Sequence, residues 1–182
     1  MAGAPTDQIR GSVDKIQAIL KNPSLKSVAR KKERRDQLRN VIFSRFDFSE
    51  MAKRSLGSHW RRLSPKEQEE FVRLFTDLLE RAYVDRIESF NDEKFIYLKE
   101  TLDQDYAEVG SRIVTDKGEE YSLNYKAHLT GSEWKVYDLV IENISLVNNY
   151  RAQFSRIITN VSYDELVRRM KEKQIEGVGE KK

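Results

Sequence analysis

The chain has 182 residues, of which 35% are charged and 38% are apolar, and its formal net charge is +3. This length is typical of one domain with an adequate core, and so mild a positive charge does not by itself indicate a nucleic-acid-binding protein. The absence of cysteine excludes disulfide bonds and thiolate metal sites, and no apolar run is long enough to span a bilayer.

The first part of the chain is predicted to be helical. A first helix begins at Thr6 and ends at Asn22-Pro23, a signal that stops helices. Its apolar residues recur at helical spacing, at Ile9, Val13, Ile16 and Leu20. A second helix is expected over residues 24–43, and a third, short helix after Phe46 ends at Gly57.

A capping box, Ser64-Pro65-Lys66-Glu67, begins the fourth and longest predicted helix, which ends near Phe90. Two further helices, at 146–159 and 162–173, are expected near the end of the chain. Between the fourth helix and these two helices, short turns join four predicted strands at Lys94–Leu102, Tyr106–Thr115, Glu119–Thr130 and Glu133–Ile144. This order predicts the α+β class, with N- and C-terminal helices packed on a curved, antiparallel four-stranded meander.

No linker divides the chain, so residues 1–173 are expected to form a single domain. Residues 174–182 are charged and contain glycine, and we expect a flexible tail there.

The last predicted strand is apolar on both faces near its centre. One face carries Trp134, Val136, Val140 and Ile144, and the other carries Tyr137, Leu139 and Ile141. A strand of this kind has apolar groups packed against both of its sides. Helices can cover one side, and the other side then faces a second layer or an internal cavity.

Two stretches carry a resemblance to a known family. WKVYDLVIENISLVNNYRAQF (Trp134–Phe154) and FDFSEMAKRSLGSHW (Phe46–Trp60), together with the long helix after Ser64, resemble the MlaC family of toluene-tolerance-type auxiliary proteins of ABC transporters. The resemblance extends from about Ile9 to Met170. It implies a cone-shaped fold, related to that of nuclear transport factors, that encloses an apolar cavity.

The resemblance also implies a function. Proteins of this family carry phospholipid through the Gram-negative periplasm and serve the lipid asymmetry of the outer membrane. The implied partners are an outer-membrane lipoprotein–porin complex and an inner-membrane ABC transporter with its substrate-binding ring. We therefore expect a monomeric, non-enzymatic carrier with phospholipid as its ligand and no other cofactor.

The N-terminus, MAGAPTDQ, has no secretory pattern and taken alone indicates a cytosolic protein. The resemblance implies instead a periplasmic protein whose signal peptide is absent from this sequence.

Candidate lipid contacts are apolar positions expected to point inward. They are Tyr97, Ile113, Tyr125, Ala127, Val136 and Val140 from the strands, and Met51, Phe75, Leu78, Leu79, Tyr150, Phe154 and Ile158 from the helices. A packed core and an apolar pocket use the same residue types, so composition does not separate them. A solid-core interaction scaffold is therefore an alternative function.

Polar residues offer little for catalysis. His59 and His128 lie on separate predicted elements, and neither has a carboxylate at metal-ligand spacing. Asp138 and Glu142 share a predicted strand face and could act as general acid and base on a small apolar substrate in a cone-shaped enzyme. The simpler interpretation is that they bind backbone amides or an arginine such as Arg112.

The segment from Lys26 to Arg39 is strongly basic. It contains Lys26, Arg30, Lys31, Lys32, Arg34, Arg35 and Arg39, offset only by Glu33 and Asp36. A solvated helix face is the usual reason for such a run. The alternative is a docking face for an anionic membrane or an acidic partner.

Overall fold

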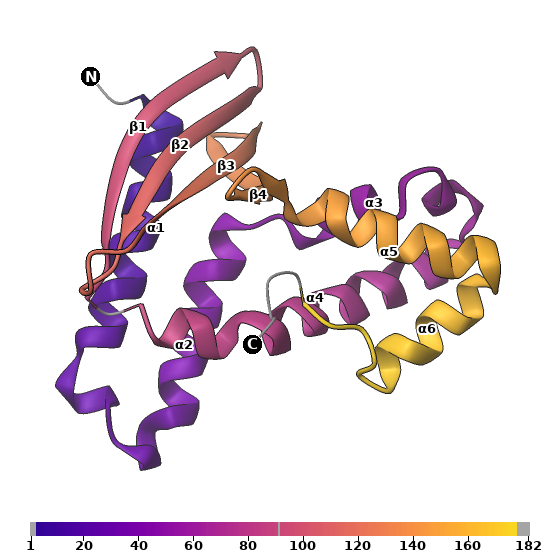
Figure 1. Ribbon diagram of the computed structural model, residues 1–182, viewed down its shortest axis with the longest axis horizontal. Coiled ribbons are helices and arrows are strands. Elements are labelled where there is room, and N and C mark those ends of the chain that lie inside the picture. Colours follow the sequence, from indigo (N-terminus) through magenta and orange to yellow (C-terminus); the bar gives the residue numbers. More distant parts are fainter. Residues whose placement is uncertain (1–2, 91, 178–182) are drawn as a thin grey trace. The chain divides into compact units, whose positions relative to one another are not determined.

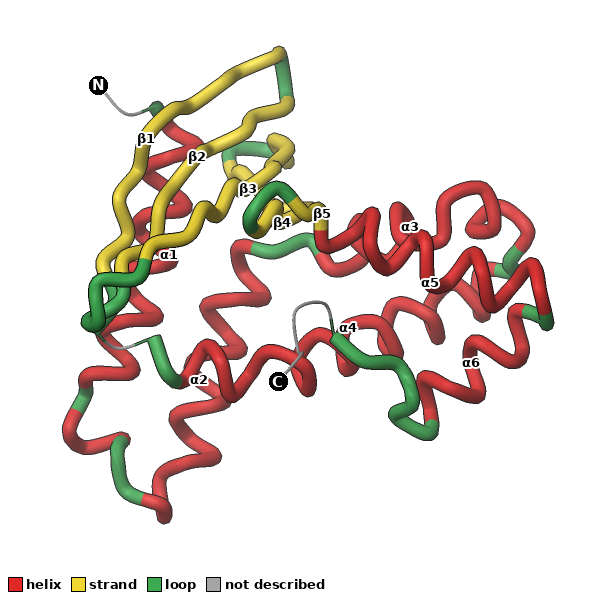
Figure 2. Tube along the Cα trace, in the orientation of Figure 1, coloured by secondary structure: helices red, strands yellow, loops and turns green. Residues whose placement is uncertain are grey.

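The computed structural model describes residues 3–90 and 92–177, and the chain forms two compact units. The sheet unit comprises Met1–Asp47 and Glu88–Asn143, and the helical unit comprises Phe48–Ile87 and Ile144–Lys182. Figures 1 and 2 show the predicted α+β order, with helices before and after a continuous run of strands.

The sheet unit begins with two helices, α1 (Ala4–Lys21) and α2 (Lys31–Arg45). Two 3-10 turns, η1 (Pro23–Leu25) and η2 (Val28–Arg30), connect them. The prediction of one helix over residues 24–43 was therefore wrong at its start. Leu25 is the one buried residue between Lys21 and α2, so packing gives a longer helix nothing to bury there.

The helical unit begins with α3 (Phe48–Leu56), the turn η3 (Gly57–Arg62) and α4 (Pro65–Glu88), whose last residue already belongs to the sheet unit. Gly57 has a φ of +57°, as expected for a glycine that ends a helix. The capping box is confirmed. Ser64 N–H donates to Glu67 Oε1 at 2.9 Å, and Glu67 N–H donates to Ser64 Oγ at 3.1 Å.

The sheet contains five strands in the order β1-β2-β3-β4-β5, so the predicted number of four was wrong. The long strands pair antiparallel, as predicted, and the elements are β1 (Lys94–Asp103), β2 (Tyr106–Val114), β3 (Glu120–Thr130), β4 (Glu133–Ile141) and β5 (Ile144–Ser145). The last predicted strand is split because Glu142 and Asn143 adopt φ values of 48° and 67°. Two left-handed residues end a strand, and neither is a glycine that would have signalled the turn.

Two helices complete the helical unit, α5 (Leu146–Asn160) and α6 (Tyr163–Lys171). Ser162 Oγ caps α6 by accepting from Glu165 N–H at 3.0 Å. The Glu165 carboxylate binds Arg168 and Arg169, and these hydrogen bonds lower its pKa to about 2. Ile175, within the predicted flexible tail, is buried, and residues 178–182 lie outside the described part.

Arg45 joins the two N-terminal helices to the sheet. Its side chain is only 12% exposed and donates from Nε to Ser12 Oγ at 2.9 Å and from Nη1 to Gln8 Oε1 at 2.9 Å. Nη1 also donates to the Trp134 carbonyl at 2.7 Å, and Glu133 lies 3.4 Å from Nη2. One guanidinium thus holds α1, α2 and β4 in register, with its polar groups satisfied inside a largely apolar unit.

Glu100 fixes the beginning of α1. Its Oε1 accepts from Thr6 N–H at 3.0 Å and from Thr6 Oγ1 at 2.7 Å. The first N–H groups of a helix lack partners within the helix, and a carboxylate there also interacts favourably with the positive end of the helix dipole. Glu100 therefore supplies from β1 the cap that no side chain provides within α1 itself.

Glu88 at the end of α4 binds two arginines of α2. Arg34 Nε and Nη2 donate to Glu88 Oε2 at 2.9 and 2.8 Å, and Arg35 Nε and Nη2 donate to Oε1 at 3.0 and 2.9 Å. The Glu88 side chain is 12% exposed. Burial raises the pKa of Glu88, but the hydrogen bonds from Arg35 and Arg34 outweigh it, and the pKa is lowered overall.

Glu88→Gln is expected to lower the free energy of unfolding near pH 7 by about 1–3 kcal/mol, since two guanidinium groups lose their ionised acceptor. A lowered folded pKa gives stability that is present above the unfolded pKa and lost as pH falls through the folded value. The difference between wild type and variant should therefore shrink on acidification below about pH 4. Urea unfolding of both proteins across this range measures it. A difference that does not change with pH would contradict the ionic role.

Candidate functional site

The thirteen predicted lipid contacts are divided between the two units. The strand positions Tyr97, Ile113, Tyr125, Ala127, Val136 and Val140 lie in the sheet unit, and the seven helix positions lie in the helical unit. Each set is described within its own unit.

The sheet unit brings three of its six predicted residues into one apolar cluster. Tyr125, Ala127 and Val136 are at most 5% exposed and pack with Ile9 and Val13 of α1. The same cluster contains Ala107, Val109 and Trp134, which were not predicted as contacts. Their signal in the sequence was the apolar stripe of the first helix, which needs an apolar partner surface.

Tyr97 and Ile113 are not among the buried members of this cluster. Tyr97 packs against it with its ring under the Arg10 guanidinium, 4.8 Å from the ring centroid. Its hydroxyl is buried and has no hydrogen-bond partner among the described residues, and burial raises its pKa. Ile113 is 1% exposed on β2.

Val140 does not point where the sequence predicted. A bulge lies in the pairing of β3 with β4, so that Ala127 pairs with Val136 while Lys126 pairs with Asp138. Beyond the bulge Val140 lies opposite Asn124. Directly opposed residues share a face, and one extra residue reverses the alternation of a strand. Val140 thus lies on the face away from Ala127, and the face assignment made for it was wrong.

Because of the same bulge, the residues of β4 that follow it lie on the face opposite to the one predicted from the sequence. Leu139 pairs with Tyr125 and packs against the apolar cluster, on the face that carries Val136. A bulge is defined by the pairing with the partner strand, and a strand that is apolar on both faces does not reveal where its alternation reverses.

The helical unit gathers six of its seven predicted residues in its interior. Phe75, Tyr150 and Phe154 are 0% exposed, and their rings pack with Phe71 in a continuous aromatic cluster. Met51, Leu78 and Leu79 are also buried, whereas Ile158 is half-buried. Leu146, Val147, Leu166 and Met170 belong to the buried set of this unit as well and were not predicted.

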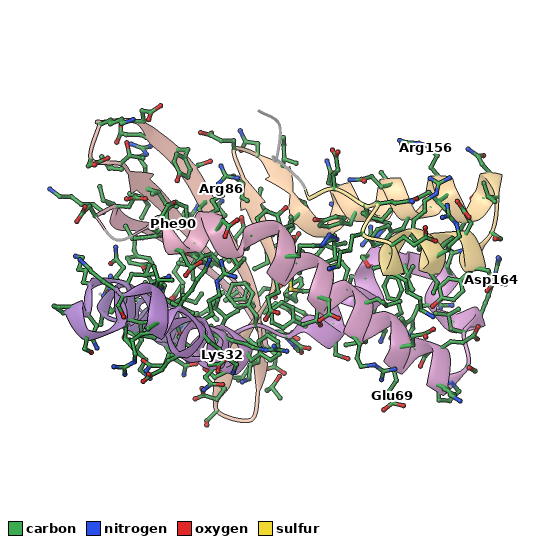
Figure 3. All side chains as sticks on the ribbon, turned by 90° about the horizontal axis from the view of Figure 1, so that it is seen from below. Lys32, Glu69, Arg86, Phe90, Arg156 and Asp164 are labelled. Atoms are coloured by element: carbon green, nitrogen blue, oxygen red, sulfur yellow. The ribbon has the colours of Figure 1, made fainter. Side chains whose placement is uncertain are left out.

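A separate open groove in the helical unit contains none of the thirteen residues. It is lined by Ser49, Trp60, Pro65, Gln68, Glu69, Val72 and Arg73. Figure 3 labels Glu69 on α4, and Arg156 and Asp164 on α5 and α6. A lining of this mixed polarity does not match the fatty chains that the predicted residues would hold.

The acid–base pair suggested by the sequence does not form on one strand. Asp138 is buried on β4, where its Oδ1 accepts from Leu139 N–H at 2.8 Å, while Glu142 is exposed in the turn after β4. His128 Nε2 lies 2.9 Å from Asp47 Oδ2. In the described ranges, no three histidine or acidic side chains are placed to hold a metal ion, and no helix is long and apolar enough to cross a membrane.

The fold and its interior define an α+β protein with helices packed on an antiparallel sheet and a buried set made almost entirely of apolar side chains. The chain belongs to the MlaC family, because the family model described as "MlaC protein" matches residues 10–172. The resemblance found in the sequence is thereby confirmed.

The chain is also similar to one curated protein in sequence and to one solved structure in fold. The "Intermembrane phospholipid transport system binding protein MlaC" of Haemophilus influenzae is 24% identical over 141 residues, which are 74% of this chain and 65% of that protein. The chain therefore matches slightly less than two thirds of that relative's length. A solved structure of a phospholipid-binding protein from Ralstonia solanacearum, in complex with a phospholipid, has a TM-score of 0.80 at 24% identity. It covers 93% of this chain and 96% of its own, which confirms the fold.

Proposed function

We propose that this protein is a periplasmic phospholipid carrier that moves lipid between the outer and inner membranes. Its membership of the MlaC family over residues 10–172 carries the proposal. The names of the two similar proteins, one an intermembrane phospholipid transport binding protein and the other a phospholipid-binding protein with bound lipid, support it. No observation on the described residues favours the enzyme or the solid-core scaffold.

The physical task explains why a carrier is needed. Two acyl tails hold roughly 30 methylene groups, and at about 0.8 kcal/mol each their exposure to water costs near 24 kcal/mol. A free lipid therefore does not cross an aqueous gap at a useful rate. A carrier whose internal apolar pocket matches the bilayer makes the transfer reversible, and its partners then set the direction.

The finer features of the proposal follow from the family. Residues 1–173 act as one lipid-binding domain without catalysis. The partners are an outer-membrane lipoprotein–porin complex and an inner-membrane ABC transporter with a substrate-binding ring. Lipid contacts are proposed at Tyr97 and Ile113 and at the seven positions of the helical unit. The packing of Tyr125, Ala127 and Val136 on α1 makes their contact with lipid a separate question, tested below.

Protein purified from a bacterial host without detergent is expected to carry about one phospholipid per chain. Organic extraction followed by lipid mass spectrometry measures the content, and native mass spectrometry gives the stoichiometry. Asp138→Asn serves as a control variant, because an amide oxygen can still accept from Leu139 N–H. It should retain lipid. Lipid-free protein from several preparations would overturn the proposed function.

A further inference from the structure

The connection between α1 and α2 combines cations with an unusually exposed apolar residue. We name residues Lys26–Lys32 the basic tip. Its seven residues are Lys-Ser-Val-Ala-Arg-Lys-Lys, with four cations and no acidic residue. Val28, between Lys26 and Arg30, is 90% exposed. In Figure 1 this connection extends beyond the end of the sheet, and Figure 3 labels Lys32 on the adjoining turn of α2.

The tip is fixed at its base and free at its end. Leu25 is 2% exposed, and its carbonyl accepts from Arg34 Nη1 at 2.8 Å. Asn22 Oδ1 caps the preceding turn by accepting from Ser24 N–H at 3.0 Å. These contacts position the turn, but none of them requires Val28 to be apolar. A single exposed apolar residue is ordinary on a protein surface. Val28 differs from such a residue because Lys26 and Arg30 flank it in the sequence and because these contacts position the turn that carries it.

The positive charge of the chain is concentrated in residues 26–39, which include the basic tip. Residues 26–39 hold seven cations and two acidic residues, a net charge of +5, whereas the whole chain has +3 and the remainder therefore −2. Arg34 and Arg35 are bound to Glu88. At the tip, Arg30 and Lys32 form exposed pairs with Glu33 and Asp36. Lys26 and Lys31 are exposed and have no ion pair in the described part of the chain.

We propose that the basic tip docks this protein onto a bilayer surface that carries anionic headgroups, with Val28 entering the headgroup layer. The inference rests on the proposed carrier function, since a carrier must approach two membranes. Basic clusters of four or more cations bind anionic leaflets, and each cation strengthens binding by about five-fold. An apolar side chain at the same point adds the interfacial contact that such surfaces accept.

The composition of the tip favours a lipid surface over a protein partner. Three of its four cations are lysines, which are strongly hydrated point charges without the planar geometry that arginine offers to carboxylates. Protein interfaces are enriched in aromatic residues and arginine and depleted of lysine. The tip contains no aromatic residue. The experiment is therefore designed to distinguish a lipid surface from an acidic protein partner.

Sedimentation with vesicles of phosphatidylethanolamine and phosphatidylglycerol, compared with phosphatidylcholine vesicles, measures the binding. The variant Lys26→Gln/Lys31→Gln/Lys32→Gln is expected to lose about 100-fold in affinity for the anionic vesicles at low salt. Val28→Ser should lose about three-fold. Added salt should weaken wild-type binding, because exposed charges are screened. The matched control is Lys53→Gln/Lys66→Gln/Lys117→Gln, which removes three exposed lysines elsewhere and should keep nearly full affinity.

Equal loss in the control and tip variants would overturn the proposal, because net charge alone would then explain the binding. So would equal wild-type affinity for neutral and anionic vesicles. Binding confined to native membrane vesicles and abolished by protease treatment would assign the tip to an acidic protein. Lipid extraction from the same variants separates this inference from the carrier function: tip variants should keep their bound lipid. Lipid-free protein that still binds anionic vesicles would overturn the carrier and leave the tip assignment standing.

Discussion

Replacing Phe154 by alanine is expected to lower the free energy of unfolding by about 3–5 kcal/mol. The side chain is 0% exposed, and its ring meets the rings of Phe71, Phe75 and Tyr150 at centroid distances of 5.8, 6.3 and 5.5 Å. Truncation removes the apolar surface that the Phe154 side chain buries on folding, and it leaves a cavity. It also breaks three ring contacts, each worth about 0.5–1.5 kcal/mol beyond burial. Urea unfolding of lipid-free protein measures the effect without a contribution from ligand.

Two variants make the experiment decisive. Phe154→Leu keeps most of the buried volume and should lose clearly less stability. Phe43→Ala removes a ring that is 39% exposed and should lose less still. A loss below about 1 kcal/mol in Phe154→Ala would contradict a packed aromatic interior. The bound lipid of the same variant is a second measurement: the proposed contact predicts that it falls, and normal lipid content would make Phe154 a core residue only.

The elements that the sequence predicted well are those whose signals are local. The capping box at Ser64 and Glu67 predicted the beginning of α4, and both of its hydrogen bonds are present. The predicted short turns contain Gly118, between β2 and β3, and Gly131, between β3 and β4, and both glycines have positive φ values. In each case a few consecutive residues contain the physical cause, so no knowledge of tertiary contacts was needed.

The predictions that were wrong depended on a partner strand or on packing. Glu142 and Asn143 form a left-handed turn without glycine, and it separates β5 from β4. The bulge that reverses the face of Val140 exists only in the pairing with β3. The segment around Val28 forms a 3-10 turn and not the predicted α-helix, because few of its residues can be buried. Period and propensity describe one segment at a time and do not contain these effects.

The candidate site was harder to predict than the fold, because a core and a lipid pocket use the same side chains. Ala127 illustrates the difficulty. Ala127 is a small residue among the larger Tyr125, Leu123 and Leu129 of the same strand, and the sequence alone favours room for an acyl tail at such a position. The structure instead places Ile9 and Val13 of α1 in the same apolar cluster. Sequence spacing gave the inward face correctly but did not show which element occupies the space in front of it.

Replacing Ala127 by tryptophan is the second substitution with a large expected effect. Ala127 is 0% exposed, pairs with Ala107 on β2 and with Val136 on β4, and belongs to the cluster that α1 closes. Two adjacent alanines leave a shallow surface on which a helix can lie close. An indole there must displace α1 or force strained rotamers, at about 1–3 kcal/mol. For a chain of this size the melting temperature should fall by roughly 2–12 °C.

Melting temperature and bound lipid, measured on one preparation, separate packing from ligand contact at this position. Ala18→Trp is the control, since Ala18 is exposed on α1 and should accept the ring with little loss. We expect Ala127→Trp to lower the melting temperature while the lipid bound per folded chain stays near normal, because Ile9 and Val13 of α1 pack in the same cluster as Ala127. Loss of lipid at an unchanged melting temperature would show the reverse. It would place an open cavity at Ala127 and make α1 a movable cover of the sheet.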